Sequence, residues 1–147
     1  MSPGANAAAE LLARTGLVVH RGPFALGAWV PAQASAVFAG LLRGNERLAA
    51  VVLDEYETTA LIREKTLLEM PPPRQLERGW AVITLDQAMD WDVVGVLAAV
   101  TSALAAAHVP LGAATAFSRD HILVHRDRLD DALAALAPVC GKVTVRD

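Results

Sequence analysis

The sequence predicts an α+β fold in which helices pack on one face of antiparallel sheets, arranged as two small modules. Residues 80–147 alternate between short apolar runs and amphipathic stretches, in the order strand–helix–strand–strand–helix–strand. This order places both helices on one side of a four-stranded sheet, the split βαβ plan. The tract Pro71-Pro72-Pro73 separates this region from the first half. A chain of 147 residues suits one domain or two very small ones.

The first half contains the expected signals for a smaller set of elements. Gly16 ends a first helix, Gly22-Pro23 marks a turn, and Pro31 suits the first turn of a second helix that Gly44 stops. The acidic segment 54–57 reads as a turn between paired strands. The expected elements are, in order, a short helix at 7–14, strands at 17–20 and 24–30, a helix at 32–42, and strands at 48–53 and 58–62.

The second half has clearer signals. Asp90 or Asp92 can cap its first helix, and Asp127 can cap its second, with Asp130 three residues later as in a capping box. The segment 118–120 reads as a hairpin turn. The expected elements are strands at 80–85, 109–117, 122–124 and 142–146, and helices at 92–107 and from 127 to about 136.

Three consecutive prolines favour an extended, semi-rigid connector and do not fit inside a sheet. The module boundary is therefore expected at this tract. The resulting division is an N-terminal tail or short helix at 1–16, a first module at 17–70, a linker at 71–79 and a second module at 80–147.

The helix predicted over residues 92–107 carries no charged residue after Asp92. A helix that is apolar or alanine-rich all round is usually covered on more than one side. One side meets its own sheet. We expect the other side to meet the first module or a second copy of the chain.

Composition excludes several classes of protein. With 54% hydrophobic residues the chain is not expected to be disordered, and no apolar stretch approaches the roughly 20 residues of a membrane helix. The net charge is -3 and Lys and Arg form no run, so neither a nucleic-acid partner nor a membrane is expected. One cysteine, Cys140, excludes an internal disulfide and fits a cytoplasmic location.

No combination of residues indicates catalysis. His121 and His125 are four apart, but in a strand that spacing separates side chains by roughly 13 Å, which argues against a shared metal. Cys140 is interpreted as an inert buried thiol. The acidic cluster at 86–92 is interpreted as helix capping and loop solubility rather than acid–base chemistry. We therefore expect a non-enzyme with no metal and no cofactor.

Gly95 lies at the start of the helix that follows the strand at 80–85. A helix N-terminus presents unpaired N–H donors and partial positive charge, which suit a carboxylate. A glycine there allows a ligand to approach the backbone. The alternative is that Gly95 only permits close packing of helix on sheet, and the sequence leaves both open. Trp91, just before this turn, lines a ligand pocket or shields a module interface.

Three local patterns, together with the order of elements, resemble the ACT family of regulatory ligand-binding modules. They are Asp92-Val93-Val94-Gly95-Val96-Leu97, the stretch from Ala105 to Leu111, and the hairpin from Phe117 to Val124. The hairpin is similar to that of the two-module subgroup that includes a cytosolic arginine sensor and the regulatory tails of aspartate kinases. The match covers residues 80–147 well, and residues 17–70 look like a degenerate partner module. The resemblance implies tandem ferredoxin-like modules.

Paired modules of this family tend to hold an amino acid at their interface. Carried onto this chain, the resemblance implies ligand-binding roles for Val94, Gly95, Thr115, Ala116, Phe117 and Asp120, faced from the first module by Glu57, Thr58 and Thr59. Three positions depart from the subgroup pattern. Ala116 stands where a hydroxyl residue is usual, Ser118 follows the aromatic in place of an acidic residue, and Arg119 replaces a small polar one. Arg119 either favours an acidic ligand or points into water.

The function implied is that of a cytoplasmic, non-catalytic regulatory protein that binds an amino acid or a similar metabolite between two ACT-like modules. The alternative is a ligand-free structural or interaction module for dimerisation or docking. Both readings expect a homodimer, and a regulated protein partner is possible. Edge strands are ready-made pairing surfaces for either.

Overall fold

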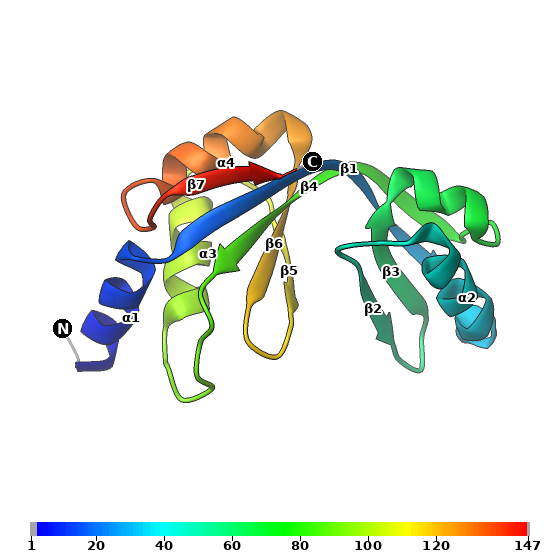
Figure 1. Ribbon diagram of the computed structural model, residues 1–147, viewed down its shortest axis with the longest axis horizontal. Coiled ribbons are helices and arrows are strands. Elements are labelled where there is room, and N and C mark those ends of the chain that lie inside the picture. Colours follow the sequence, from blue (N-terminus) through cyan, green and yellow to red (C-terminus); the bar gives the residue numbers. More distant parts are fainter. Residues whose placement is uncertain (1–2, 147) are drawn as a thin grey trace. The chain divides into compact units, whose positions relative to one another are not determined.

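The computed structural model describes residues 3–146 and divides into two compact units. Unit 1 comprises the residues up to Arg21 together with those from Ala81 onward, and unit 2 comprises Gly22–Trp80. Strands β1 (Gly16–Trp29) and β4 (Gln75–Asp86) each contribute to both units. Unit 2 is therefore an insertion between two parts of unit 1, and the units are not consecutive along the chain (Figure 1).

Unit 1 is a sheet with two helices, α3 and α4, on one face and a third helix, α1, beside α3 (Figure 1). Its strands follow the order β5-β6-β4-β1, and β7 pairs in parallel with β1. Besides its parts of β1 and β4, the elements are α1 (Pro3–Ala13), α3 (Val96–Ala106), β5 (Gly112–Thr115), β6 (Asp120–His125), η3 (Arg126–Arg128), α4 (Leu129–Leu136) and β7 (Val143–Arg146).

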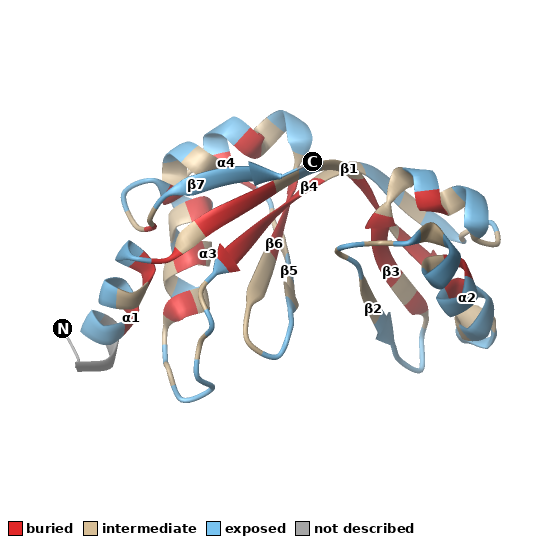
Figure 2. Ribbon diagram, viewed as in Figure 1, coloured by how far each residue is buried: buried red, intermediate tan, exposed pale blue. Residues whose placement is uncertain are grey.

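The core of unit 1 lies between the sheet and its helices. Alternate residues of β4 point into it, as the period of two in a strand requires. Figure 2 shows the buried stretches along β1 and β4 and the buried turns of α3. The large side chains of this core that are fully shielded from solvent are Leu12, Leu17, Ile83, Leu85, Leu104, Ile122 and Leu136.

Unit 2 repeats the strand–helix–strand–strand order but replaces the second helix with a 3-10 turn. Its strand order is β2-β3-β1-β4. Trp29, which is fully buried, is the centre of its core with Val37, Ala60 and Ile62. The remaining elements are η1 (Pro31–Gln33), α2 (Ala34–Gly44), β2 (Ala50–Leu53), β3 (Thr58–Arg63) and η2 (Glu64–Glu69).

The α+β class predicted from the sequence is confirmed, and the structure divides into two units. These units are not consecutive, so the division differs from the expected 17–70, 71–79 and 80–147. β4 begins at Gln75, inside the expected linker, and Gly22-Pro23 lies within β1 instead of forming a turn. The prolines turn the chain back beside β1, where the Pro71 carbonyl accepts a 2.7 Å hydrogen bond from Trp29 Nε1. Part of the expected tail at 1–16 is helical from Pro3, and residues 1–2 lie outside the described residues.

Three smaller expectations also need correction. α3 begins at Val96, so neither Asp90 nor Asp92 caps it, and α4 has no side-chain cap because Arg128 occupies its N-cap position. The four residues of β7 are exposed, and its pairing with β1 is parallel, so the sheet is not antiparallel throughout. The second side of α3 is covered by α1, which the sequence did not indicate.

Candidate functional site

A cavity of about 220 Å³ opens in unit 1 between the start of α3 and the β5–β6 hairpin. This is below the roughly 300–1,000 Å³ typical of drug-sized ligand pockets and suits a small metabolite. Three chain segments line it: the β4–α3 loop, the first turn of α3 and the hairpin tip. The lining residues are Met89, Asp90, Trp91, Val93, Gly95, Val96, Leu97, Ala98, Thr115, Ala116, Phe117, Ser118, Arg119 and Asp120.

The first turn of α3 lines this cavity. Gly95 is the N-cap residue, and no side chain caps the helix. The Gly95 carbonyl accepts the first helical bond from Ala99 N–H at 3.0 Å. The amides of residues 96–98 precede the first residue with an intrahelical acceptor, so they are the donors that an α-helix leaves unpaired. Together with the positive end of the helix dipole, these unpaired amides would favour an anionic group.

Gly95 is required by backbone conformation and not by crowding. Its φ of 95° lies in the left-handed region that non-glycine residues rarely adopt. A Cβ added there would meet only Ala8 Cβ of α1, at an ordinary 3.7 Å. The expectation of close packing on the sheet is therefore wrong, since the near neighbour is α1. The glycine sets the angle at which the chain enters α3.

One hydrogen bond and one ion pair join the hairpin to the β4–α3 loop and the end of β4, and a further hydrogen bond lies within the hairpin. Met89 N–H donates to the Ser118 carbonyl at 3.0 Å. Arg119 Nε pairs with Asp86 Oδ1 at 3.1 Å, and Thr115 Oγ1 donates to Asp120 Oδ1 at 2.7 Å. Arg119 thus pairs with the end of β4, an arrangement that neither of the two expectations stated for it included. Its charge is matched by a protein carboxylate and is not presented to an acidic ligand.

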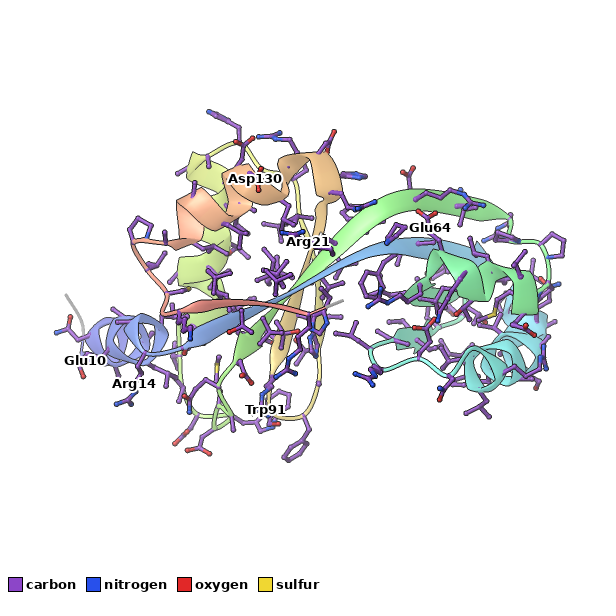
Figure 3. The ribbon with its side chains drawn as sticks, turned by 45° about the horizontal axis from the view of Figure 1, so that its top comes forward. Glu10, Arg14, Arg21, Glu64, Trp91 and Asp130 are labelled. Atoms are coloured by element: carbon purple, nitrogen blue, oxygen red, sulfur yellow. The ribbon has the colours of Figure 1, made fainter. Side chains whose placement is uncertain are left out.

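Two exposed aromatic rings stand at the mouth of the cavity. Trp91, in the β4–α3 loop, is 70% exposed, and Phe117, at the hairpin tip, is 84% exposed. Their ring centroids are 6.0 Å apart with an interplanar angle of 68°, an edge-to-face pair. Figure 3 shows Trp91 at the end of its loop, away from the helices. Both rings line the cavity and leave much of their surface in water.

The sequence of residues 75–138 matches the family described as ACT domain. This segment runs from the start of β4 through α4 and contains every residue that lines the cavity. The chain contains an ACT domain. No match was found among the curated proteins.

Solved structures share the fold over most of the chain. A protein from Agrobacterium tumefaciens superposes with a TM-score of 0.74 at 16% identity, covering 91% of this chain and 95% of that one. A protein of unknown function from Vibrio cholerae, described as a possible transport protein, gives 0.66 at 18% identity, covering 92% and 98%. The ligand-free regulatory subunit of aspartate kinase from Thermus thermophilus gives 0.65 at 16%, covering 86% and 99%. At these identities the likeness shows the fold alone.

Five residues singled out from the sequence gather at the ACT-domain cavity, namely Gly95, Thr115, Ala116, Phe117 and Asp120. Val94 is 74% exposed and is not among the lining residues. The resemblance gave no ligand-binding role to Met89, Asp90 or Val93. Met89 and Asp90 lie outside the three motifs, and Val93 lies within the first motif at a position to which no ligand contact was assigned. Asp90 had instead been read as a helix cap.

Glu57, Thr58 and Thr59 lie in unit 2, and their facing the ACT-domain cavity stays a prediction. Glu57 and Thr59 line a separate hollow of about 520 Å³ on the sheet of unit 2. The Glu57 carboxylate pairs with Arg74 at 3.5 Å. The Thr58 side chain is fully buried, and its hydroxyl has no hydrogen-bond partner among the described residues. A surface ligand therefore does not reach the Thr58 side chain.

A second hollow of unit 1, about 450 Å³, lies between β1, β7 and the start of α4. Arg21 and Asp130, labelled in Figure 3, are on its rim, with Arg126 and Asp127. These four charges are two of each sign, so the rim as a whole favours neither anions nor cations. It lies at the start of α4 but lacks the exposed aromatic pair of the smaller cavity.

Unit 1 contains a partly buried polar row that joins β4 to β6 and β1. Thr84 Oγ1 lies 2.8 Å from His121 Nδ1 and 3.3 Å from His20 Nε2. Burial lowers the pKa of His121, Asp120 opposes this by raising it, and Arg119 lowers it further. Burial also raises the pKa of the Cys140 thiol, which weakens it as a nucleophile. Within residues 3–146 no group of acidic, His and Cys side chains could hold a metal ion.

Proposed function

We propose that this protein is a non-catalytic regulatory protein that binds an amino acid or a similar small metabolite in the cavity of its ACT domain. The observation that carries the proposal is the meeting of the uncapped first turn of α3 with a small, mainly apolar cavity. The ligand's carboxylate would accept hydrogen bonds from the amides of residues 96–98.

The ammonium group of an amino acid also has a candidate partner in this cavity. The Asp90 carboxylate lines the cavity, and among the described residues it makes no hydrogen bond or ion pair. It is therefore available to an ammonium group. A site with amide donors at one end and a free carboxylate at the other matches the two charges of a zwitterion. The binding cavity lies wholly within unit 1.

A regulatory role agrees better with the lining than a catalytic one does. The described lining residues include no His, Cys or Lys, and their one hydroxyl–carboxylate hydrogen bond, Thr115 to Asp120, joins neighbouring positions of the β5–β6 hairpin. The solved structures that share the fold include a regulatory subunit of aspartate kinase. We infer a similar role here, in the cytoplasm and with a protein target. No helix among residues 3–146 is long and apolar enough to span a membrane.

The test is calorimetric titration of the chain with each of the common amino acids, followed by a titration with the best binder as its carboxamide. The carboxamide should bind at least tenfold more weakly, since it lacks the anion that the helix start recognises. Ala98 is exposed on the first turn of α3 and lines the cavity, so Ala98→Leu should block binding.

The matched control is Ala105→Leu, an exposed position on the same helix that does not line the cavity. This variant should bind like the unmodified protein. Absence of binding by every amino acid, in a protein shown to be folded, would remove the proposal. Equal loss of binding in both alanine variants would remove the cavity as the site.

A second candidate function is association of two copies through β7. All four residues of this edge strand are exposed, and Val143 and Val145 remain 40% and 46% exposed. An exposed apolar edge strand is a template for pairing with another chain. Light scattering after size exclusion should give a dimer, and Val145→Lys should return it to a monomer. A monomer at all concentrations would exclude this candidate.

A further inference from the structure

The ring pair at the cavity mouth, Trp91 and Phe117, is not part of a hydrophobic core in the described structure. Trp91 and Phe117 contact each other edge-to-face, yet 70% and 84% of their surfaces remain exposed. Large aromatic side chains left in water at the mouth of a cavity mark a surface that becomes covered when something binds. Each ring is on a loop, so each can move toward a ligand without disturbing the sheet.

The charged groups of the cavity are almost fully used by the protein itself. Arg119 is paired with Asp86, and the Asp120 carboxylate accepts a hydrogen bond from Thr115. If Asp90 receives the ammonium of a zwitterion and the amides of residues 96–98 receive its carboxylate, no unpaired charge is left for a side chain. A charged side chain would lose its hydration without gaining an ion pair. The remaining lining residues are apolar apart from Ser118.

We propose that the ligand is an α-amino acid with an aromatic or large apolar side chain, and that Trp91 and Phe117 are the residues that determine this specificity by closing over it. This inference rests on the proposed function and identifies the ligand class of the same site. The cavity of about 220 Å³ encloses the amino acid's polar end, and the two rings supply the apolar surface that its side chain needs. Amino acids with acidic or basic side chains are rejected because their charge has no partner.

The experiment compares L-phenylalanine, L-leucine, L-alanine, L-aspartate and L-lysine by calorimetry on the full chain. Phenylalanine and leucine should bind, and alanine, aspartate and lysine should each bind at least tenfold more weakly. Trp91→Ala and Phe117→Ala should each weaken the binding of phenylalanine by about tenfold without changing the melting temperature. Tryptophan fluorescence should respond to phenylalanine, and Trp91→Ala should remove most of that response, because the other two tryptophans, Trp29 and Trp80, are in unit 2 and do not line the cavity.

The control variant is Phe38→Ala, which removes an exposed aromatic ring from α2 in unit 2 and should leave affinity unchanged. If lysine or aspartate binds more tightly than phenylalanine, or if both ring variants bind phenylalanine like the unmodified chain, the specificity proposal is overturned. The ligand-binding function would stand in either case. If none of the twenty common amino acids binds, both proposals are lost.

Discussion

Units 1 and 2 share the same order of strands and helix, but their hydrophobic cores are built differently. In unit 1 two helices cover the sheet and a third covers α3, so the core is spread over many leucine, isoleucine and valine side chains. In unit 2 one helix and the 3-10 segment η2 cover the sheet, and the core is centred on a single large side chain, Trp29. The difference suggests why the cavity is in unit 1. A broad core can position two exposed loops without depending on them for stability.

The strongest test of this difference is to remove Trp29. Trp29→Ala deletes the largest fully buried side chain and its hydrogen bond to the Pro71 carbonyl. We expect a loss of about 3–5 kcal/mol in the free energy of unfolding, as for other buried aromatic truncations. Urea titration followed by hydrogen exchange should locate the loss in α2 and β3. Trp91→Ala is the control, with an expected change within about 0.5 kcal/mol because that ring is exposed.

A smaller but more specific loss is expected at Gly40 of α2. A Cβ there would lie 2.5 Å from the Glu69 carbonyl oxygen and 2.8 Å from Met70 Sδ, so η2 would have to move. In an unconstrained helix, Gly→Ala is favourable by about 1 kcal/mol. Here the sign should reverse, with Gly40→Ala destabilising by about 1–3 kcal/mol through overpacking.

The control for this steric argument is Gly112→Ala in unit 1. Its added Cβ would meet Leu123 at an ordinary 3.6 Å, so the stability measured by urea titration should change little. A neutral or stabilising Gly40→Ala would show that η2 is not packed tightly on α2. It would also weaken the view that close packing of η2 on α2 replaces the second helix that unit 2 lacks.

The sequence predicted the elements better than it predicted their connection. Alternation and β-branching located β3, β6 and β7 because those signals are local. Gly22-Pro23 and the three prolines were read as breaks, yet β1 passes through the first and β4 begins just after the second. Whether a strand continues past such residues depends on a neighbouring strand distant in sequence, which no local pattern contains. The insertion of unit 2 into unit 1 was missed for this reason.

The site was partly predictable because some of its residues have local sequence signatures and others depend on contacts that are distant in sequence. The glycine that starts α3 and the hairpin from Thr115 to Asp120 both have local signatures, and the structure brings them to one cavity. The roles of Asp90, Trp91 and Arg119 depend on where two loops meet. Arg119 could be assigned only after its contact with Asp86, 33 residues away, was known.

Substitution of two buried threonines by valine should change stability in opposite directions. Thr58 of unit 2 is fully buried, and its hydroxyl is unpaired among the described residues, so Thr58→Val should stabilise by up to about 1 kcal/mol. Thr15 of unit 1 is equally buried but donates to the Leu11 carbonyl at 2.7 Å. Thr15→Val should therefore destabilise by about 1–2 kcal/mol. Thermal unfolding measures both, and equal signs would contradict the argument.

The smallest expected effect is a dependence on pH that belongs to unit 1. Burial is the main cause that lowers the pKa of His121 from its ordinary value of 6.5, so the unfolded chain takes up this proton before the folded one does. The stability that the folded protein gains by keeping His121 neutral is fully present above pH 6.5. It is lost as the pH falls through the lower pKa that His121 has in the folded protein. Stability should therefore decrease on acidification from pH 7.

His121→Gln separates this contribution from that of the carboxylates, because an amide retains a polar partner for Thr84 Oγ1 but does not titrate. The variant should lose less stability than the unmodified protein between pH 7.0 and about pH 5.5. Hydrogen exchange should place the rescued protection in β4 and β6, which carry Thr84 and His121, and not in β3 of unit 2. Identical pH profiles would mean that acid acts elsewhere in the chain. A rescue confined to unit 1 would show that protonation of half-buried His121, and not a change in the Trp29 core, causes the loss of stability in acid.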